Sequence, residues 1–355
     1  MRFPDRTVRK AIHWRNKVNI LVTGGFGFIG GQLIDYLTKS NPKHKIHVVD
    51  NLSSNPIPFE ELLKELGPRP NLSYSICSVE EFYSKGTDAK WDRIYHLASV
   101  VGPAGVLPHA GKIVRSIVAD TYCMIDIALK CNAKLVDVST SEVYGGGQEG
   151  YCNENFAKIV PAKTTVRLEY AVAKLAAETA LINTAKVSPL DVSIVRPFNV
   201  AGPRQSGKGG FVLPRFISMA ILGKPLTVFG VGNQIRAFTH VKDMAKGIIA
   251  AMERGKTGGV YNLGNPKNKI SISELADLVI KVTKSKSKKI FVDPKEIYGP
   301  LFEEANDKYP DATLAMTELE WHPEYSIETA IEDTYEYLKR IDAKLFDTLS
   351  GLKRQ

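Results

Sequence analysis

The chain has 355 residues, of which 44% are hydrophobic and 24% are charged, and its formal net charge is +9. This length is typical of about two domains, and the composition supplies enough apolar residues for a large core. These values exclude a disordered chain, a collagen-like fibre and a small disulfide-stapled scaffold.

The positive charge is concentrated in two short segments. Residues 1–17, which we expect to form a basic tail, contain six basic residues and one acidic residue, and residues 281–289 contain five lysines. The rest of the chain is therefore close to neutral. Lysine runs without interleaved aromatic residues are typical of solvated surfaces, so we do not expect nucleic-acid binding.

The cysteines and the N-terminal residues bear on metal sites and location. Cys77, Cys123, Cys131 and Cys152 show neither a CxxC pair nor zinc-ligand spacing, so we expect no metal site and no disulfide framework. The first apolar run, residues 18–22, is too short to cross a bilayer, and it is not a signal segment. We therefore expect a cytoplasmic protein that does not enter a membrane.

From residue 18 onward, short apolar runs alternate with helical patterns, which is typical of an α/β fold with a parallel sheet. The runs are mostly unalternated, as expected of strands buried on both faces. The predicted strands are Val18–Val22, Ile46–Asp50, Ser73–Cys77, Arg93–Leu97, Lys134–Val138 and Val192–Val195. The predicted helices between them are Phe28–Thr38, Ile113–Cys131 and Thr165–Lys186.

After Pro197 the alternation of strands and helices breaks, and Gly and Pro become frequent. We expect a smaller lobe to begin here. It is predicted to contain a loop at 202–210, helices at Phe211–Leu222, Ser273–Thr283 and Ile327–Lys339, and a strand at Thr227–Phe229.

The strongest local signal is the glycine-rich segment Thr23–Gly30, which follows the first predicted strand and opens the first predicted helix. Gly24, Gly27 and Gly30 allow a tight turn, close approach of a pyrophosphate, and close packing of helix on strand. Asp50 ends the second predicted strand, where a carboxylate can accept hydrogen bonds from an adenosine ribose. Because a carboxylate would repel a 2′-phosphate, we expect NAD rather than NADP.

A second group of residues indicates redox chemistry on an alcohol. Tyr170 and Lys174 are four residues apart in a predicted helix and share one face. The ammonium and a positive nicotinamide would lower the phenol pKa from about 10, so that Tyr170 takes a proton while hydride leaves for NAD. At the end of the fifth predicted strand, Thr140 is placed to hydrogen-bond the same alcohol oxygen, and Glu142 supplies a carboxylate nearby.

These motifs occur in order with two more segments, His96–Ser99 and Arg196–Pro203. Over about residues 18–340 they resemble the extended short-chain dehydrogenase/reductase family, which acts on nucleotide sugars. The resemblance implies a Rossmann doubly wound sheet in 18–197, with a later return near 236–262, and a smaller α/β substrate-binding lobe in 198–345. It also implies bound NAD and a homodimer built on the two long helices.

The resemblance also assigns individual residues. Thr140, Tyr170 and Lys174 would form the catalytic triad, with Lys174 on the nicotinamide ribose as well. Further cofactor contacts would come from Phe28, Ile29, Asn51, Leu97, Ala98 and Pro197, and substrate contacts from Asn199, Arg215, Thr227, Arg236 and Asp311. The family's late Arg-x-Pro-Asp pattern appears here with Lys308 in place of the arginine, which leaves a second diphosphate contact open.

The members of this family share oxidation of the sugar C4 and differ in the later steps of their reactions. The common hexose 4,6-dehydratases carry an acidic Asp where this chain has Ser141, whereas Thr140-Ser141-Glu142 resembles UDP-glucuronate decarboxylases and some amino-sugar dehydratases. The loop at 100–105, however, departs from the decarboxylase pattern. We include Ser141 and Glu142 in the catalytic set.

Several functions remain open on this pattern. We predict a UDP-sugar 4-epimerase of the UDP-glucose type. A UDP-glucuronate decarboxylase that forms UDP-xylose is the first alternative, and a nucleotide-sugar 4,6-dehydratase is the second. A catalytically silent NAD-binding scaffold is the alternative outside enzymes.

Overall fold

The computed structural model describes residues 17–86, 89–145, 149–158, 163–303 and 307–352. Apart from Lys17, the expected basic tail lies outside these residues. The strands are β1 (Asn19–Thr23), β2 (Lys45–Asp50), β3 (Leu72–Ile76), β4 (Arg93–His96), β5 (Lys134–Val138), β6 (Tyr151–Cys152), β7 (Asp191–Pro197), β8 (Val200–Ala201), β9 (Leu226–Phe229), β10 (Ile235–Ala237), β11 (Thr239–His240), β12 (Gly259–Leu263), β13 (Lys269–Ser271), β14 (Lys289–Val292) and β15 (Tyr309–Pro310).

The helices are α1 (Phe28–Ser40), α2 (Phe59–Leu66), α3 (Val79–Ser84), α4 (Ile113–Cys131), α5 (Val166–Val187), α6 (Val212–Ile221), α7 (Val241–Arg254), α8 (Ile272–Thr283), α9 (Pro294–Tyr298), α10 (Thr313–Glu318), α11 (Ile327–Arg340) and α12 (Ala343–Ser350). Short 3-10 turns lie at η1 (Leu107–His109), η2 (Ser141–Tyr144) and η3 (Pro266–Asn268).

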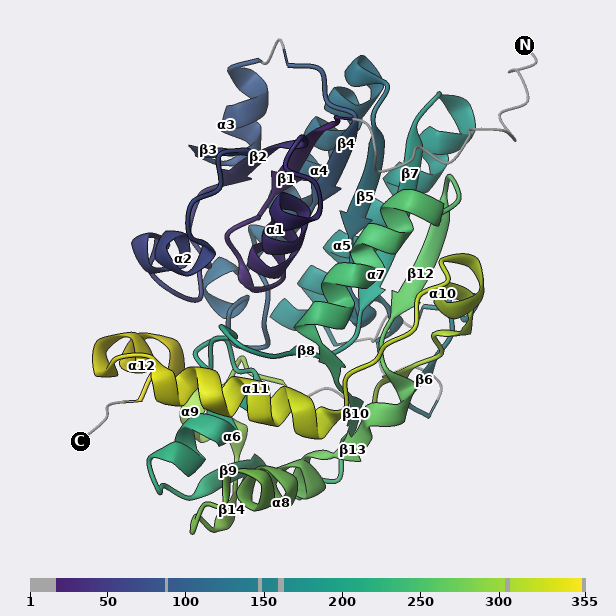
Figure 1. Cartoon of the computed structure of the whole chain (residues 1–355). Coiled ribbons are helices and arrows are strands. Elements are labelled where there is room, and N and C mark those ends of the chain that lie inside the picture. The colour runs from purple at the N-terminus through teal and green to yellow at the C-terminus, as the bar shows by residue number, and fades with distance from the viewer. Residues whose placement is uncertain (1–16, 87–88, 146–148, 159–162, 304–306, 353–355) are drawn as a thin grey trace.

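A seven-stranded parallel sheet forms the centre of the molecule, in the order β12-β7-β5-β4-β1-β2-β3 (Figure 1). This is the Rossmann doubly wound order, with β12 added beside β7. All six predicted strands are present, and α4 has the predicted limits. Because parallel strands end at the same edge, the loops after β1, β2, β4, β5 and β7 meet there.

The pattern expected of strands buried on both faces does not hold for β3. This strand lies at the edge of the sheet, and the side chains of Tyr74 and Ile76 are 45% and 46% exposed. Tyr74 instead packs edge-on against Phe26 and Phe59. Helices α2, α3, α7, α9, α10 and α12 were not predicted from the sequence.

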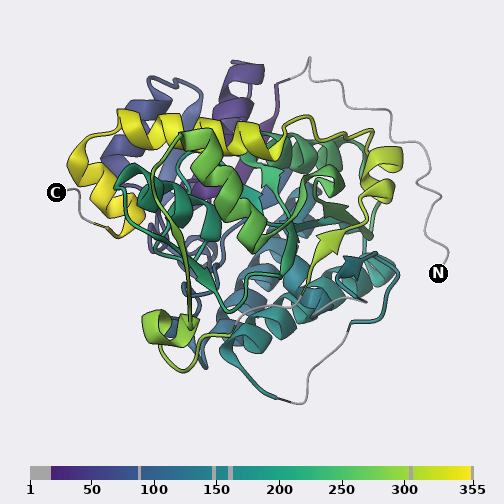
Figure 2. The same cartoon turned by 90° about the horizontal axis from the view of Figure 1, so that it is seen from below.

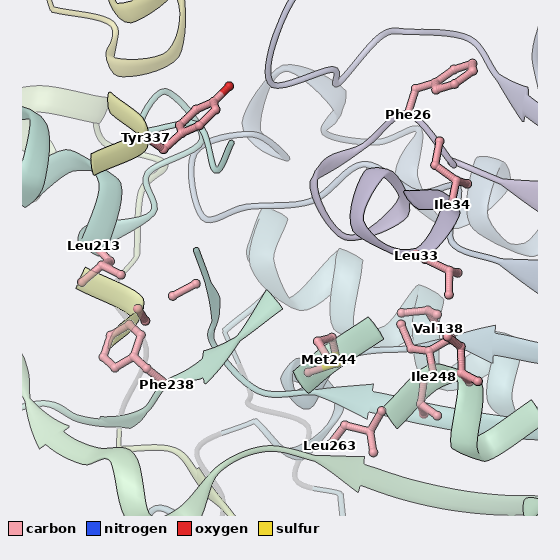
Figure 3. Packing of buried hydrophobic residues seen from close by; sticks show 14 of the residues in the cluster. Phe26, Leu33, Ile34, Val138, Leu213, Phe238, Met244, Ile248, Leu263 and Tyr337 are labelled. Atoms are coloured by element: carbon pink, nitrogen blue, oxygen red, sulfur yellow. The ribbon is translucent and has the colours of Figure 1, made fainter. Parts of the chain in front are cut away.

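Two layers of apolar side chains cover the sheet. On one face, α1 and α7 pack together, and Leu33, Val138 and Ile248 point toward one another (Figure 3). On the other face, α3, α4 and α5 bury a separate cluster that includes Met124 and Leu181.

After β7, helix α7 and strand β12 return to the central sheet, and most of the other elements form a smaller α/β lobe at the carboxyl edge of the sheet (Figure 1). Its centre is the parallel pair β9 and β14, packed against α6 and α8, with α11 across both helices. The apolar cluster of the α1–α7 face continues into this lobe through Leu213 and Phe238 (Figure 3). The domain limits that we gave from the sequence stay a prediction.

Within the described ranges, no helix combines the length and apolar character needed to span a membrane. The same ranges contain no group of His, Cys, Asp or Glu side chains arranged to hold a metal ion. The four cysteines are free thiols.

Candidate active site

The glycine loop between β1 and α1 is shaped by close packing. Gly24 has a φ of +67°, and a Cβ there would lie 2.7 Å from the backbone nitrogen of Ala98. A Cβ at Gly30 would lie 2.2 Å from the carbonyl oxygen of Gly24. At Gly27 a Cβ would lie 3.3 Å from the same carbonyl oxygen, a tight contact that disfavours a side chain much less than the contacts at Gly24 and Gly30 do.

The start of α1 fits a pyrophosphate. Its N-cap is Gly27, no side chain caps its first N–H groups, and its first turn holds no acidic residue. Bare N–H groups at a helix N-terminus attract an anion, and the absent Cβ at Gly27 allows one to approach the backbone closely. Phe28 and Ile29 form the first turn of this helix.

Asp50 links the glycine loop to the end of β2. Its Oδ2 accepts a hydrogen bond from the Phe26 N–H at 2.9 Å, and its Oδ1 accepts one from the Leu52 N–H at 2.8 Å. Burial raises the pKa of Asp50, and the two N–H groups oppose this change. The remaining lone pairs of the carboxylate are suited to ribose hydroxyls.

The other predicted cofactor residues also lie at the carboxyl edge of the sheet. Asn51 follows β2, Leu97 and Ala98 follow β4, and Pro197 ends β7. The Leu97 N–H donates to the Thr23 carbonyl at 3.0 Å, and the Ala98 N–H donates to the Thr23 hydroxyl at 3.3 Å. The loop after β4 is thereby held against the glycine loop.

The loop at residues 139–145, here called the catalytic loop because it carries the predicted catalytic residues, follows β5 and faces α5. Thr140 caps the turn η2, and its hydroxyl accepts a hydrogen bond from the Glu142 N–H at 3.2 Å. The side chains of Thr140 and Ser99 lie close enough to the Tyr170 phenol to act on its pKa. The structure therefore brings Thr140 and Tyr170 together, and it adds Ser99, a residue of the His96–Ser99 motif to which we had given no role.

The protonation of Tyr170 differs from our expectation. Burial raises the pKa of its phenol, the carboxylates of Glu142 and Asp137 raise it further, and the hydroxyls of Thr140 and Ser99 oppose them. Lys174 is buried, and its Nζ donates to the Val138 carbonyl at 2.9 Å. The groups of the chain itself therefore raise the pKa of the Tyr170 phenol and do not lower it as we expected.

Glu142 lies in a cluster of charges that no sequence motif indicated. Arg167 at the start of α5 binds both carboxylate oxygens, at 2.7 and 2.9 Å, and Lys308 forms a second ion pair with the same carboxylate. Burial alone would raise the pKa of Glu142, but the two cations hold it well below its usual range. Glu142 is therefore an ion-paired anion, poorly suited to remove a proton.

A buried polar network supports the strand end that carries the catalytic loop. The carboxylate of Glu178 accepts hydrogen bonds from the Ser139 hydroxyl at 2.5 Å and from two nitrogens of Arg196, at 2.8 and 2.5 Å. Arg196 donates further to the Tyr144 hydroxyl at 2.7 Å, and Tyr144 donates to Asn262 at 2.8 Å. Charge-assisted bonds of this kind fix the backbone before Thr140.

Two of the predicted substrate residues contact each other in the smaller lobe. Arg215 on α6 is buried and donates to the hydroxyl of Thr227 on β9. Its guanidinium also lies 4.0 Å from the centre of the Phe229 ring, a cation–π contact. Arg215 is therefore not a surface residue.

Two further predicted substrate residues lie near the smaller lobe's edge. Asn199 has a φ of +34° and donates to the Ala237 carbonyl at 3.2 Å. Arg236 is buried, and its backbone pairs with that of Lys308. Arg236 also lowers the pKa of Lys308, although burial is the main cause of that shift.

Asp311 is engaged within the chain. Its carboxylate accepts hydrogen bonds from the Tyr151 hydroxyl at 2.7 Å, the Asn153 amide at 2.8 Å and the Thr313 N–H at 2.9 Å. These bonds outweigh burial and hold its pKa at about 2. The contacts indicate a structural role, and its contact with a substrate stays a prediction.

The carboxyl edge of this Rossmann sheet carries both the glycine loop and the Tyr170, Lys174 and Thr140 set, an arrangement typical of NAD-dependent enzymes. Comparison with known proteins identifies the family. The chain belongs to the NAD dependent epimerase/dehydratase family, whose model matches residues 20–264. Its cofactor is NAD, and its relatives are nucleotide-sugar epimerases, dehydratases and decarboxylases of the extended short-chain dehydrogenase/reductase type.

Three similar proteins cover nearly the whole chain. A UDP-N-acetyl-alpha-D-glucosaminuronate decarboxylase from Bacillus cytotoxicus is 33% identical over 327 residues, 92% of this chain and 99% of its own. UDP-glucuronic acid decarboxylase 1 from Danio rerio is 30% identical over 338 residues, 93% of this chain and 75% of its own. The crystal structure of UDP-glucuronic acid 4-epimerase from Bacillus cereus, in complex with UDP-glucuronic acid and NAD, is 28% identical, with a TM-score of 0.78 over 91% of this chain and 99% of that one.

Proposed function

We propose that this enzyme is a UDP-hexuronate decarboxylase. It oxidises C4 of the sugar, releases C6 as CO2 and reduces the resulting 4-keto pentose. The observation that carries the proposal is the charge cluster at the catalytic loop, where Arg167 and Lys308 pair with Glu142. Two cations thus pair with one carboxylate, and Arg236 lies beside Lys308. The surplus positive charge of this region suits a substrate with both a carboxylate and a diphosphate.

The catalytic groups match the chemistry of this reaction. Oxidation at C4 turns a hexuronate into a β-keto acid, in which cleavage of the C5–C6 bond leaves an electron pair delocalised onto O4. NAD, which the glycine loop and Asp50 would hold, would supply the hydride acceptor for the oxidation at C4 and the hydride donor for the final reduction. Tyr170 takes the proton of the C4 hydroxyl and gives it back at the end, and Thr140 hydrogen-bonds O4 while it carries negative charge.

The balance of the reaction requires one external proton. CO2 leaves with neither of its bonding electrons, C5 takes a proton, and the hydride and the Tyr170 proton return to C4 and O4. A UDP-hexuronate and a proton thus become a UDP-pentose and CO2. Glu142, held as an anion by Arg167 and Lys308, orients these cations rather than acting as the base.

The similar proteins support a uronate substrate. Two of them are named as decarboxylases of UDP-linked uronates, and the third is an epimerase crystallised with UDP-glucuronic acid. This support reverses the order of our two candidates from the sequence. The 4-epimerase remains the second candidate, supported by the 28% identity to the Bacillus cereus epimerase.

Product analysis separates the candidates. The purified enzyme is incubated with UDP-glucuronate, UDP-N-acetylglucosaminuronate and UDP-glucose, and the products are identified by NMR. We expect a UDP-pentose and CO2 from a uronate. Inversion at C4 with C6 retained would instead establish the epimerase, and a 4-keto-6-deoxy sugar would establish the dehydratase. Tyr170→Phe is the control, and we expect it to lose at least about 100-fold in turnover.

A further inference from the structure

Asp137 is a buried carboxylate that the proposed reaction does not use. It lies in β5, two residues before Ser139, and its side chain is 1% exposed. Neither of its oxygens has a hydrogen-bond partner among the residues that the structure describes. An unpaired carboxylate in the interior is costly, so the surroundings of Asp137 have to compensate its charge.

The partner is found on the face of the sheet toward which Asp137 points. Along β5, residues 135, 137 and 139 share that face. Ser139 there contacts Glu178 of α5, one helical turn beyond Lys174. The Lys174 Nζ lies 2.9 Å from the carbonyl oxygen of Val138, the residue next to Asp137. The buried ammonium and the buried carboxylate are therefore neighbours at the end of β5.

The groups beside Asp137 on the neighbouring strands carry no positive charge that could compensate its carboxylate. His96 is its direct cross-strand partner on β4, and Ile194, which cannot ionise, is its partner on β7. The Thr23 hydroxyl accepts the Ala98 N–H, which leaves its own hydrogen for His96 Nδ1 at 2.6 Å. Burial, and next the Lys174 charge, lower the pKa of His96 to about 3, so the ring is neutral.

The remaining carboxylates near Lys174 are occupied or less buried. Glu178 of α5 is paired with Arg196. Asp120 of α4 is only partly buried, and burial together with Glu80 raises its pKa to about 7. Burial lowers the pKa of Lys174, and among the carboxylates that oppose this change Asp137 has the largest effect.

We propose that Asp137 is a positioning residue of the active site, the buried counter-ion that keeps the Lys174 ammonium charged. A neutral Lys174 would donate only weaker hydrogen bonds, without charge assistance, to the nicotinamide ribose, and it would not favour ionisation of Tyr170. The proposal rests on the Tyr170 and Lys174 chemistry of the proposed function, and it is independent of which sugar is bound.

The test measures the charge of Lys174 directly. The full-length enzyme loaded with NAD is labelled with [13Cε]lysine, and the Lys174 resonance is assigned by its loss in Lys174→Arg. Its pKa is then followed by NMR titration in wild type and in Asp137→Asn. We expect the variant to lower the Lys174 pKa by about one unit or more, a tenfold change in its ionisation constant.

The matched control is Asp243→Asn. Asp243 is also a fully buried aspartate with one unpartnered oxygen, but it lies in α7, where its other oxygen accepts the N–H groups of Glu324 and Tyr325. We expect no change in the Lys174 pKa there. An Asp137→Asn titration that matches wild type, or a shift of equal size in the control, would overturn the proposal.

Two additions keep the result decisive. If Asp137→Asn does not fold, Asp137→Leu, of similar size and without a need for hydrogen bonds, is titrated against the same expectation. In an active preparation, the basic limb of the pH–rate profile should move to lower pH by the same amount, whereas a purely structural role would lower the rate without moving the limb. The two proposals can also fail separately. If Asp137→Asn shifts the Lys174 pKa but the wild-type enzyme turns over none of the three UDP-sugars, the counter-ion role of Asp137 is supported and the proposed function is refuted.

Discussion

At the residue scale, the site depends on a few buried charges whose balance sets the chemistry. Glu142 is shared by Arg167 and Lys308, and Lys174 lies among the carboxylates of Asp137, Asp120 and Glu178. In such a setting, removal of one partner leaves the other as an uncompensated charge. The predictions at this scale therefore concern single charges.

Lys308 provides the first of these predictions. The Lys308 side chain is buried and pairs with Glu142. Lys308→Met removes this cation, which in the proposed function attracts the substrate carboxylate. Lys308→Arg keeps the positive charge and restores the arginine of the family pattern. We expect Lys308→Met to raise the KM for a UDP-hexuronate at least about tenfold and Lys308→Arg to change it little. Inhibition by UDP, which has no sugar carboxylate, is the control. An equal loss of UDP affinity would place Lys308 at the diphosphate instead.

Asp137 leads to a prediction about stability. Burial raises its pKa from 3.8 to about 6, so the carboxyl group contributes full stability below pH 3.8, and this contribution is lost as the pH rises through 6. The loss is on the order of 3 kcal/mol. Asn cannot ionise, so Asp137→Asn does not lose this stability. The difference in Tm, variant minus wild type, should therefore increase by a few °C from pH 5 to pH 7. If the Tm values of wild type and Asp137→Asn instead change in parallel from pH 5 to pH 7, the raised pKa of Asp137 is contradicted.

The residues of the site differ in how far the sequence reveals them. Thr140, Tyr170 and Lys174 belong to short motifs whose spacing places them on one strand end and one helix face. Lys308 lies 166 residues from Glu142, and no local pattern indicates their contact. Asp311 shows the opposite case, since its motif suggested a ligand whereas its carboxylate binds three groups of the chain.

At the scale of elements, the limits of the strands and helices could be predicted well for residues 18–197 and less well for the residues that follow. Buried strands such as β5 and the long helix α4 have uniform apolar patterns, which fixed their limits within a residue or two. Helix α7 was missed because it follows a region rich in Gly and Pro and contains Gly247. The structure explains this glycine, since a Cβ there would lie 2.9 Å from Leu263.

The glycine loop yields a prediction at this scale. In Gly30→Ala the new methyl group would meet the Gly24 carbonyl at 2.2 Å, so we expect the loop to lose its shape and the Tm to fall. In Gly27→Ala the Gly24 carbonyl oxygen is 3.3 Å away, a tight contact that needs only a small shift, so we expect a smaller fall in Tm than in Gly30→Ala and at least about tenfold weaker NAD binding. Thermal unfolding and NAD titration of both variants check this. Full NAD affinity in Gly27→Ala would contradict the assigned pyrophosphate contact.

At the scale of the whole molecule, one exposed surface is apolar along two neighbouring helices. Helices α4 and α5 pack side by side on one face of the sheet (Figure 2). Val114 and Tyr122 are 40% and 51% exposed on α4, with Val118 between them on the same stripe, and Val172 is 37% exposed on α5. Exposed apolar side chains gathered on two neighbouring helices are typical of an interface between subunits.

We therefore predict a homodimer that buries this stripe through a twofold axis, in which each α4–α5 pair packs against its copy. Light scattering should give twice the chain mass of 39.2 kDa. In Tyr122→Glu, two carboxylates would be buried at the centre of the interface, so we expect a monomer. Tyr74→Glu is the matched control, because Tyr74 is similarly exposed but lies on the edge strand β3, and it should remain a dimer. If Tyr122→Glu keeps the dimer mass, the subunits contact each other through another surface.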